Sequence, residues 1–283
     1  MKQIKLLLLL ASASVTGAFA QSNGLTDMSQ SRYAKMANTG IDAVHWTNGF
    51  WGERFIVFSG TTVQSMWNTW NTPEVSHGFR NFEIAAGICK GEHWGPPFHD
   101  GDMYKWMEGV ASVYAVNKDL ELDKLMDNFI ACVVKAQRAD GYIHTPVIIE
   151  ELNKGIDSHT QADSQQQTVI GTKVGSEDEK GAFANRLNFE TYNLGHLMMA
   201  GIVHHRATGK TTLLDAAVKA TDFLCHFYET ASAELARNAI CPSHYMGVVE
   251  MYRATGNPRY LELSKNLIDI RGMVESGTDD NQD

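Results

Sequence analysis

The hydrophobic positions of this chain recur with a helical period in three pairs of segments. Apolar residues spaced three, four and seven apart form paired stripes within residues 103–133, 194–224 and 245–270. A turn that is polar or contains glycine separates the two stripes of each pair. Short connections between amphipathic helices are typical of antiparallel neighbours, so the pattern predicts three helical hairpins.

A short phrase is repeated at the turns of these hairpins. Residues 205–209 read His-Arg-Ala-Thr-Gly, and residues 252–256 read Tyr-Arg-Ala-Thr-Gly, 47 positions later. A fainter copy, Tyr-Ala-Val-Asn-Lys, occupies residues 114–118. Glycine suits the left-handed residue that ends a helix. A repeat of this length indicates supersecondary units stacked on copies of themselves.

The stacked hairpins predict an all-α fold of the (α/α)6 toroid type. A closed toroid needs six hairpins, whereas the pattern shows three, preceded by one or two weak helices within residues 61–90 and an irregular segment over 21–60. We therefore expect residues 21–283 to form an incomplete, N-terminal portion of such a barrel. An open solenoid is the alternative, but long inserts on one side favour the toroid.

A polar insert interrupts the array at residues 143–186. It is rich in Gln, Ser, Asp, Thr and Gly, with β-branched patches at 144–149 and 168–174. These patches suggest a β-hairpin, whereas the glutamine tract at 165–167 suggests a mobile segment. Loops of this length are usually functional or disordered, and the sequence leaves both open.

The first twenty residues have the pattern of an export signal. Lys2 and Lys5 precede the leucine run at 6–10, and small residues lead to Ala-Phe-Ala at 18–20. This pattern predicts a cleaved signal peptide, with Gln21 as the first mature residue and a secreted or periplasmic protein. No other apolar run is long enough to span a bilayer, so we expect no membrane partner.

The composition narrows the possible partners. A net charge of -9 argues against nucleic acid, which needs a basic surface. Aromatic residues make up 10% of the chain, enough to line a ligand cleft, although most are expected in the core. The four cysteines match no zinc or redox spacing, and we expect neither a metal site nor a disulfide among them.

Several polar residues stand near the ends of the predicted hairpins. Asp100 and Asp102 open the first hairpin, where they either cap the helix or meet sugar hydroxyls. His144 follows a glycine turn in an extended stretch, from which its ring could point into a cleft. Glu190 and His196 share one face of the helix that opens the second hairpin. A helix-start carboxylate and a buried, hydrogen-bonded histidine are the structural alternatives.

The remaining helical histidines, His204, His205 and His244, lack partners at metal-ligand spacing, and we interpret them as structural. A glycosidase needs two carboxyl groups, or a nucleophile and an acid/base, on either side of the scissile bond. Nothing in the sequence pairs such groups at a known distance. The residues alone therefore predict a carbohydrate-binding cleft without an assigned nucleophile.

Four stretches give the chain a family resemblance. They are Gly-Phe-Trp-Gly-Glu-Arg at 49–54, Asp-Gly-Asp-Met-Tyr-Lys-Trp-Met-Glu at 100–108, Ala-Gln-Arg-Ala-Asp-Gly-Tyr at 136–142, and residues 190–209. In these stretches the chain resembles glycoside hydrolase family 127, the β-L-arabinofuranosidases. The likeness covers nearly all of the mature chain, and the motifs are specific when taken together.

The resemblance implies hydrolysis of terminal β-L-arabinofuranosyl residues of plant glycans, with retention of configuration. It also implies a zinc-bound cysteine nucleophile and a glutamate acid/base. No cysteine of this chain stands in the family's nucleophile or ligand motif, so no catalytic residue and no zinc ligand is carried over. His144 and His196 match histidines that contact the sugar in the family. Gly101 and the long insert depart from the commoner pattern and leave the exact sugar and linkage open.

The sequence thus favours the substrate-binding part of an exported glycosidase, inactive by itself. One alternative is a non-catalytic carbohydrate-binding or scaffold domain, which could self-associate through an exposed barrel seam. Another is an (α/α)6 glycosidase acting on uronic acids, which would need a basic subsite that the acidic cleft mouth does not suggest.

Overall fold

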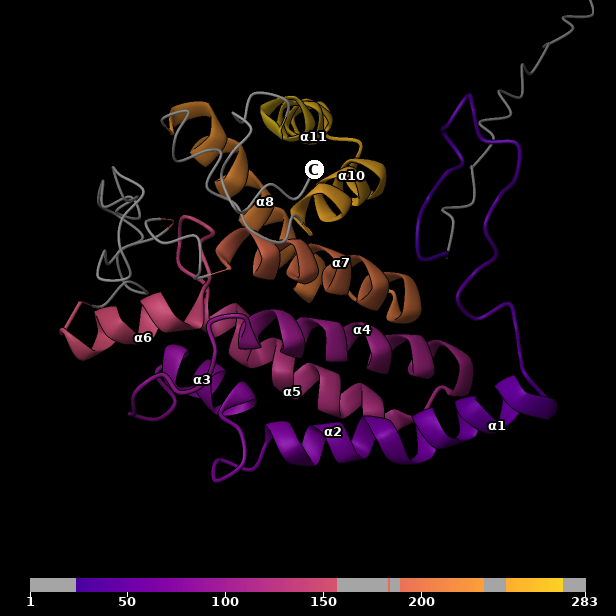
Figure 1. Ribbon diagram of the computed structural model, residues 1–283, viewed down its shortest axis with the longest axis horizontal. Coiled ribbons are helices and arrows are strands. Elements are labelled where there is room, and N and C mark those ends of the chain that lie inside the picture. The colour runs from indigo at the N-terminus through magenta and orange to yellow at the C-terminus, as the bar shows by residue number, and fades with distance from the viewer. Residues whose placement is uncertain (1–23, 157–182, 184–188, 232–242, 272–283) are drawn as a thin grey trace, which may run out of the picture.

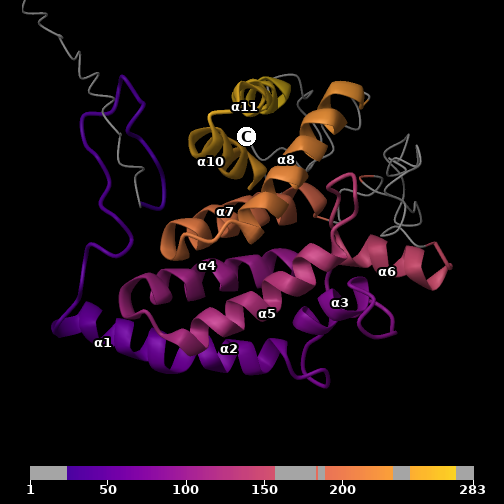
Figure 2. The same cartoon turned by 180° about the vertical axis from the view of Figure 1, so that it is seen from behind.

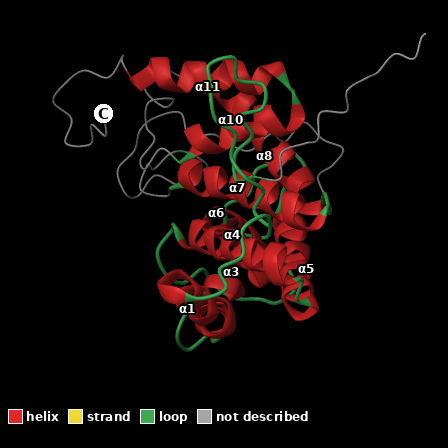
Figure 3. Cartoon of the chain, turned by 90° about the vertical axis from the view of Figure 1, so that its right-hand side faces the viewer, coloured by secondary structure: helices red, strands yellow, loops and turns green. Residues whose placement is uncertain are grey.

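The computed structural model describes residues 24–156, 183, 189–231 and 243–271. Within these ranges every regular element is helical (Figure 3). A π-helical segment, η1 (Phe58–Thr62), joins the first two helices. The α-helices are α1 (Gly49–Val57), α2 (Val63–Trp70), α3 (Gly78–Ala85), α4 (His99–Asn117), α5 (Leu120–Ala136), α6 (Thr145–Asn153), α7 (Glu190–Thr208), α8 (Thr212–Thr230), α10 (His244–Thr255) and α11 (Pro258–Arg271).

The three hairpins predicted from the hydrophobic period are confirmed as α4–α5, α7–α8 and α10–α11. Their first helices form one row, in which α7 packs between α4 and α10. Their second helices form another row, in which α8 lies beside α5 and α11 (Figures 1 and 2). Two such rows are the arrangement of part of an (α/α)6 toroid. The all-α prediction is therefore correct.

Glycines allow the helices of the first row to approach closely. A Cβ atom on Gly101 of α4 would lie 2.7 Å from Oδ1 of Asn193 on α7. A Cβ atom on Gly195 of α7 would lie 2.5 Å from the backbone nitrogen of His244 on α10. Real Cβ atoms do not come so near to other heavy atoms, so any side chain at these positions would push the helices apart.

The repeated turn phrase has a common backbone geometry. Lys118, Gly209 and Gly256 all adopt left-handed conformations, with φ of 55°, 78° and 71°. Each donates its N–H to the carbonyl four residues earlier, at 2.7–2.8 Å. This is the single-bond left-handed cap that ends many helices. The phrase is therefore repeated because each hairpin stops its first helix in the same way.

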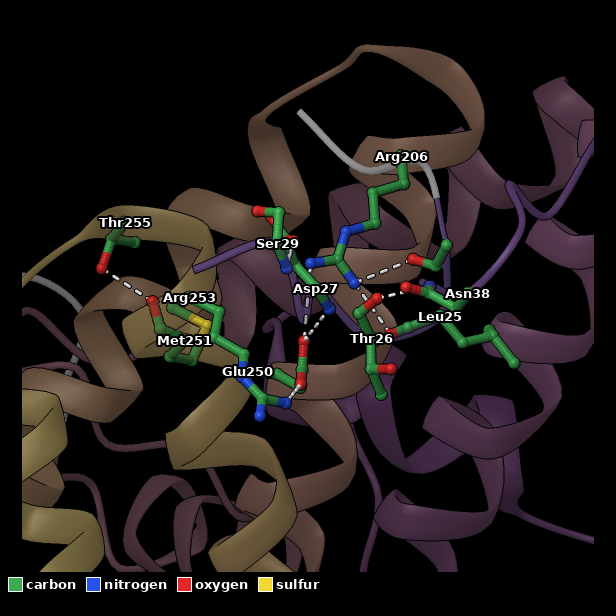
Figure 4. Close-up of polar contacts among 11 residues, drawn as sticks. Leu25, Thr26, Asp27, Ser29, Asn38, Arg206, Glu250, Met251, Arg253 and Thr255 are labelled. Carbon is green, nitrogen blue, oxygen red and sulfur yellow. Dashed lines mark hydrogen bonds and ion pairs between the residues drawn. The ribbon is translucent and has the colours of Figure 1, made fainter. Parts of the chain in front are cut away.

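A buried ion network, called here the arginine cluster, fastens the N-terminal segment to α7 and α10 (Figure 4). It consists of Asp27, Arg206, Glu250 and Arg253. Nη1 of Arg206 donates to the carbonyls of residues 24 and 25, at 3.0 and 2.7 Å. One oxygen of Glu250 accepts from the backbone N–H of Asp27 and lies 3.5 Å from Nη2 of Arg206, and the other pairs with Arg253. Two arginines from successive copies of the repeated phrase thus share one buried carboxylate.

Aromatic rings hold the N-terminal helices against the first hairpin. Trp67 of α2 stacks on Trp106 of α4 with ring centroids 5.1 Å apart. Phe82 of α3 meets Phe129 of α5 edge to face at 5.0 Å. Such pairs add roughly 1 kcal/mol each beyond the area they bury. The weak pattern over residues 61–90 correctly predicted helices there, and these rings pack the two short helices against the core.

Two local predictions were wrong. Residues 49–57, expected to be irregular, form α1, which leaves Phe50 and Ile56 62% and 68% exposed. The patch at 144–149 was interpreted as a strand, but α6 begins at Thr145, directly after the extended residue His144. Pro146 fits the first turn of a helix, and Asp100 accepts hydrogen bonds from both the N–H and the hydroxyl of Thr145. A contact with a distant residue therefore stabilises the start of this helix.

Other predictions fall outside the described residues. They are the signal peptide at 1–20, the patch at 168–174 and the glutamine tract. Cys89, Cys132 and Cys225 carry free thiols, whereas Cys241 is not among the described positions. Among the described helices, none combines the length and the apolar character that crossing a bilayer requires.

Candidate functional site

A group of buried polar side chains, called here the histidine cluster, gathers where α4, α6 and α7 begin. It consists of Asp100, His144, Thr145, Glu190 and Asn193, each at most 4% exposed. Its members are far apart in the sequence, since Asp100 and Thr145 are separated by 45 residues and His144 and Asn193 by 49. The stacking of the hairpins, together with the start of α6, brings them to one end of the helical array.

Asp100 fixes the backbone that carries the central histidine. Its Oδ2 accepts a 2.7 Å hydrogen bond from the N–H of Thr145, and its Oδ1 accepts another from the Thr145 hydroxyl. Both carboxylate oxygens of Asp100 therefore accept hydrogen bonds from Thr145, and these contacts are within the protein.

His144 is fully buried, yet one of its ring nitrogens is open. Nδ1 lies 3.3 Å from Nδ2 of Asn193 and 3.6 Å from Oδ2 of Asp100. Nε2 has no hydrogen-bond partner among the described residues. A buried polar atom without a partner costs about 1–3 kcal/mol, so a ligand that satisfied it would gain from doing so.

Glu190 is held by the protein on both oxygens. One accepts from the hydroxyl of Tyr142, and the other accepts a 2.7 Å hydrogen bond from the N–H of Phe183. Burial raises the pKa of Glu190, although the hydrogen bonds from Tyr142 and from the Phe183 N–H oppose the rise. The hydrogen bonds of this carboxyl group therefore go to other segments of the chain.

Asp102 and His196 belong to a second, more open group along α4 and α7. Lys105 lies 2.8 Å from Asp102 and donates a 2.6 Å hydrogen bond to the hydroxyl of Tyr192. The Tyr192 ring meets the His196 ring edge to face, with centroids 4.7 Å apart. Nδ1 of His196 lies 3.7 Å from Oε1 of Glu108, too far for a hydrogen bond, and neither atom has a hydrogen-bond partner among the described residues.

The sequence did not single out three further histidines beside this site. His77 and His99 meet the rings of Trp94 and Trp70, with centroids 5.0 and 5.7 Å apart. Burial lowers the pKa of His93 to about 4, with Asp100 and His144 among the groups that influence it. The signal that could have revealed them is the density of His and Trp between residues 67 and 99, which has no helical period.

The described residues do not offer a metal site. No three His, Cys, Asp or Glu side chains among them come together in a way that could hold an ion. Burial raises the pKa of Cys132 and of Cys225 to about 11, so both thiols are protonated at neutral pH. Metal ligation needs the thiolate, and these thiols lie within helices that pack in the core.

Comparisons with known proteins agree with this architecture. The model of the family "Beta-L-arabinofuranosidase, GH127 catalytic domain" matches residues 43–283. A non-reducing end β-L-arabinofuranosidase from Bifidobacterium longum subsp. longum is 31% identical over 198 residues, which are 70% of this chain and 27% of that protein.

Solved structures give the same result. One described as a glycoside hydrolase is 72% identical, with a TM-score of 0.64, over 93% of this chain and 32% of the other. A GH127 β-L-arabinofuranosidase from Geobacillus stearothermophilus T6 is 30% identical, with a TM-score of 0.65, over 81% of this chain and 33% of the other. The chain thus spans about a third or less of the length of these relatives.

Proposed function

This chain belongs to the GH127 β-L-arabinofuranosidase family, and we propose that it supplies the sugar-binding part of such an active site. The substrate class is a glycan with β-L-arabinofuranosyl groups at its non-reducing ends. The relatives named above support this choice of sugar, and the acidic groups around the site favour a neutral sugar over a uronic acid.

The observation that carries the proposal is the open Nε2 atom of His144. The ring is buried, and within the histidine cluster Nε2 of His144 is the one side-chain polar atom without a hydrogen-bond partner among the described residues. Sugar sites are built from a small number of oriented polar groups and aromatic rings. A sugar oxygen that met Nε2 would satisfy it.

The neighbouring groups have complementary parts in this proposal. Glu108 and His196 offer further polar atoms to hydroxyl groups, and the half-exposed ring of Trp94 offers an apolar face to a sugar. Asp100 and Glu190 hold the backbone around the site through their own contacts. Binding and orientation of the sugar are therefore the tasks assigned to these residues.

Bond cleavage is not assigned to the described residues. The described residues do not fit the zinc-bound cysteine that the family resemblance implies, because their thiols lie in no cluster of metal ligands and those of Cys132 and Cys225 are buried and protonated. We place the zinc site, the nucleophile and the acid/base in the part of the family's length that this chain does not span. The same observation favours the second candidate, a carbohydrate-binding domain without catalysis.

Calorimetric titration with β-L-arabinofuranosyl oligosaccharides, beside a hydrolysis assay with zinc present, tests the proposal. We expect binding by the 283-residue chain, and about tenfold weaker binding by His144→Ala, the usual scale of one lost hydrogen bond to a ligand. His226→Ala, at an exposed position on α8, is the matched control and keeps the affinity.

The outcomes separate the candidates. Weak or absent binding by the unchanged chain overturns the proposed sugar site. Binding without turnover agrees with a binding role, and turnover by this chain alone overturns the absence of catalytic groups. Loss of affinity in His226→Ala as well as in His144→Ala would show that the effect is not local.

We also propose that the chain is exported with cleavage before Gln21, on the basis of its basic, apolar and small-residue N-terminal pattern. N-terminal sequencing of the protein recovered from the medium or periplasm tests this. A mature chain that still begins at Met1 would contradict it.

A further inference from the structure

We propose that Asn193 is a positioning residue that holds His144 in the tautomer with its proton on Nε2. In this form Nδ1 accepts a hydrogen bond from Asn193, and Nε2 presents an N–H donor at the site. The use of that donor for a sugar oxygen rests on the proposed function, whereas the tautomer itself does not.

The orientation of the Asn193 amide is fixed by two backbone groups. Oδ1 accepts a 2.9 Å hydrogen bond from the N–H of Gly101, and Nδ2 donates a 2.9 Å hydrogen bond to the carbonyl of Pro97. Rotating the amide by half a turn would place an NH2 group against an N–H and a carbonyl against a carbonyl. Both contacts would be repulsive, so the hydrogen-bond network identifies which side-chain atom is the nitrogen.

The orientation of the amide decides the protonation of the ring. An amide nitrogen has two hydrogens and no acceptor, and one of its hydrogens is used by Pro97. The other is directed to Nδ1 of His144, 3.3 Å away. Nδ1 must therefore carry its lone pair rather than a proton, and the proton of the neutral ring is on Nε2.

Asp100 is the competing partner for the same nitrogen. Its Oδ2 lies 3.6 Å from Nδ1, beyond hydrogen-bond distance, and already accepts from the Thr145 N–H. Protonation of Nδ1 to meet Asp100 would set two N–H donors, those of His144 and Asn193, against each other. The shorter contact and the satisfied carboxylate favour Asn193 as the group that sets the tautomer.

The site therefore presents a hydrogen-bond donor at Nε2 of His144, where the other neutral tautomer would present an acceptor. A donor at Nε2 requires an acceptor on the ligand, such as a sugar hydroxyl or ring oxygen. Gly101 is part of the same device, because its N–H orients Asn193 and its missing side chain leaves room for Oδ1.

Long-range proton–nitrogen spectra of the full chain labelled with 15N-histidine report the tautomer directly, and His144→Gln identifies the signal by its absence. We expect the pattern of the Nε2–H form in the free protein near neutral pH. A signal with the Nδ1–H pattern overturns the proposal by itself, whether or not any variant folds.

Two variants distinguish Asn193 from Asp100 as the controlling group. Asn193→Asp replaces the donor by an acceptor, so we expect the ring to change to the Nδ1–H form and the affinity for an arabinofuranosyl oligosaccharide to fall about tenfold. Asp100→Asn should leave the Nε2–H form in place. The opposite result, a tautomer changed by Asp100→Asn and unchanged by Asn193→Asp, would assign control to Asp100.

The sugar titration keeps the two proposals apart. An Nε2–H ring in a protein that binds no arabinofuranosyl oligosaccharide overturns the proposed function and leaves the tautomer assignment standing. An Nδ1–H ring in a protein that binds the sugar overturns the tautomer assignment and leaves the proposed function standing.

Discussion

Helix α7 carries a buried polar cluster at each end, and the two clusters differ in which of their atoms have hydrogen-bond partners. At its C-terminal end, the arginine cluster joins Arg206 to Glu250 and to the backbone of the N-terminal segment (Figure 4). Both oxygens of Glu250 have partners there. At the other end, the histidine cluster satisfies Asp100 and Glu190 but leaves Nε2 of His144 open among the described residues.

We propose that the arginine cluster is structural and that the histidine cluster binds the sugar. A buried charge whose partners all come from the protein contributes to the specific arrangement of its segments, and removal of one partner is costly. A buried group with an open atom has stability to gain from a ligand. Neither burial nor a single open atom identifies a site by itself, since residues of both clusters are buried and Nε of Arg206 also lacks a hydrogen-bond partner among the described residues. The charge of Arg206 is paired with Glu250, whereas His144 stands at a position that the family resemblance assigns to sugar contact.

The largest expected effect comes from breaking the arginine cluster. Glu250→Ala leaves Arg206 buried without its counter-charge and releases the N–H of Asp27. We expect a loss of about 3–5 kcal/mol in the free energy of unfolding, measured by urea denaturation. Sugar affinity should be unchanged at a temperature where the variant is folded.

Glu262→Ala is the matched control for this substitution. Glu262 also pairs with a basic residue, Lys265 at 2.7 Å, but both side chains are exposed. Exposed pairs contribute less than about 1 kcal/mol. Equal effects of the two substitutions would contradict the distinction between a buried network and a surface pair.

A second prediction concerns His204, a buried histidine on α7 that belongs to neither cluster. Burial, with Lys210 as the next cause, lowers the pKa of His204 to about 4 from a usual 6.5. The folded state favours the neutral ring, so its contribution to stability is complete above pH 6.5 and is lost as the pH falls toward 4. The loss approaches about 3 kcal/mol when the ring is fully protonated.

Urea denaturation of His204→Gln between pH 7 and pH 4.5 checks this prediction. The variant should lose less stability over that interval than the unchanged chain, while His93 still contributes a slope of the same sign because its pKa is also lowered to about 4. Parallel curves for the two proteins would mean that His204 does not titrate with folding.

The sequence predicted the helices whose apolar residues recur with a local period, and it missed helices that lack such a period or that depend on distant contacts. The three hairpins were predictable because their apolar stripes and their left-handed turns are local signals. Helix α6 was missed because its β-branched residues suggest a strand, and the partner that favours the helix, Asp100, is 45 residues from Thr145. Helix α1 was missed because Phe50 and Ile56 are exposed, so its apolar residues do not follow a buried stripe.

The sequence could predict which residues belong to the candidate site, but not which contacts they make. His144 and His196 were identified through their positions after a glycine turn and on one helix face and through the family resemblance, and Asp100 through its position at the start of a helix. The sequence could not show that Asp100 and Glu190 are used up by contacts with the chain, or that Asn193 orients His144, because each of these facts is a distance across the fold.

A third prediction tests the close approach of α4 and α7 beside the histidine cluster. Gly101→Ala places a methyl group 2.7 Å from Oδ1 of Asn193, so α4 must shift or the amide must turn away. We expect a loss of about 1–3 kcal/mol in stability, together with weaker sugar binding. Gly60→Ala, in η1, meets nothing within 4 Å and should leave both quantities nearly unchanged or slightly raise stability.

The smallest expected effect is at Lys118, where the first hairpin has a lysine in the left-handed position that glycine occupies in the other two. Lys118→Gly removes the strain of a side chain in this conformation, worth about 1 kcal/mol, but also loses the contact of Nζ with the carbonyl of Ala207 at 3.3 Å. We expect a net gain of about 0.5 kcal/mol in thermal or urea denaturation.

Lys118→Ala separates the two contributions, because it loses the amine and keeps the strain, and it should be slightly destabilising. Sugar affinity should not change in either variant, since Lys118 lies the length of α4, about 27 Å, from the histidine cluster. A change in affinity would show that the two ends of the helical array are coupled. Such coupling would contradict the proposed division between a structural arginine cluster and a sugar-binding histidine cluster.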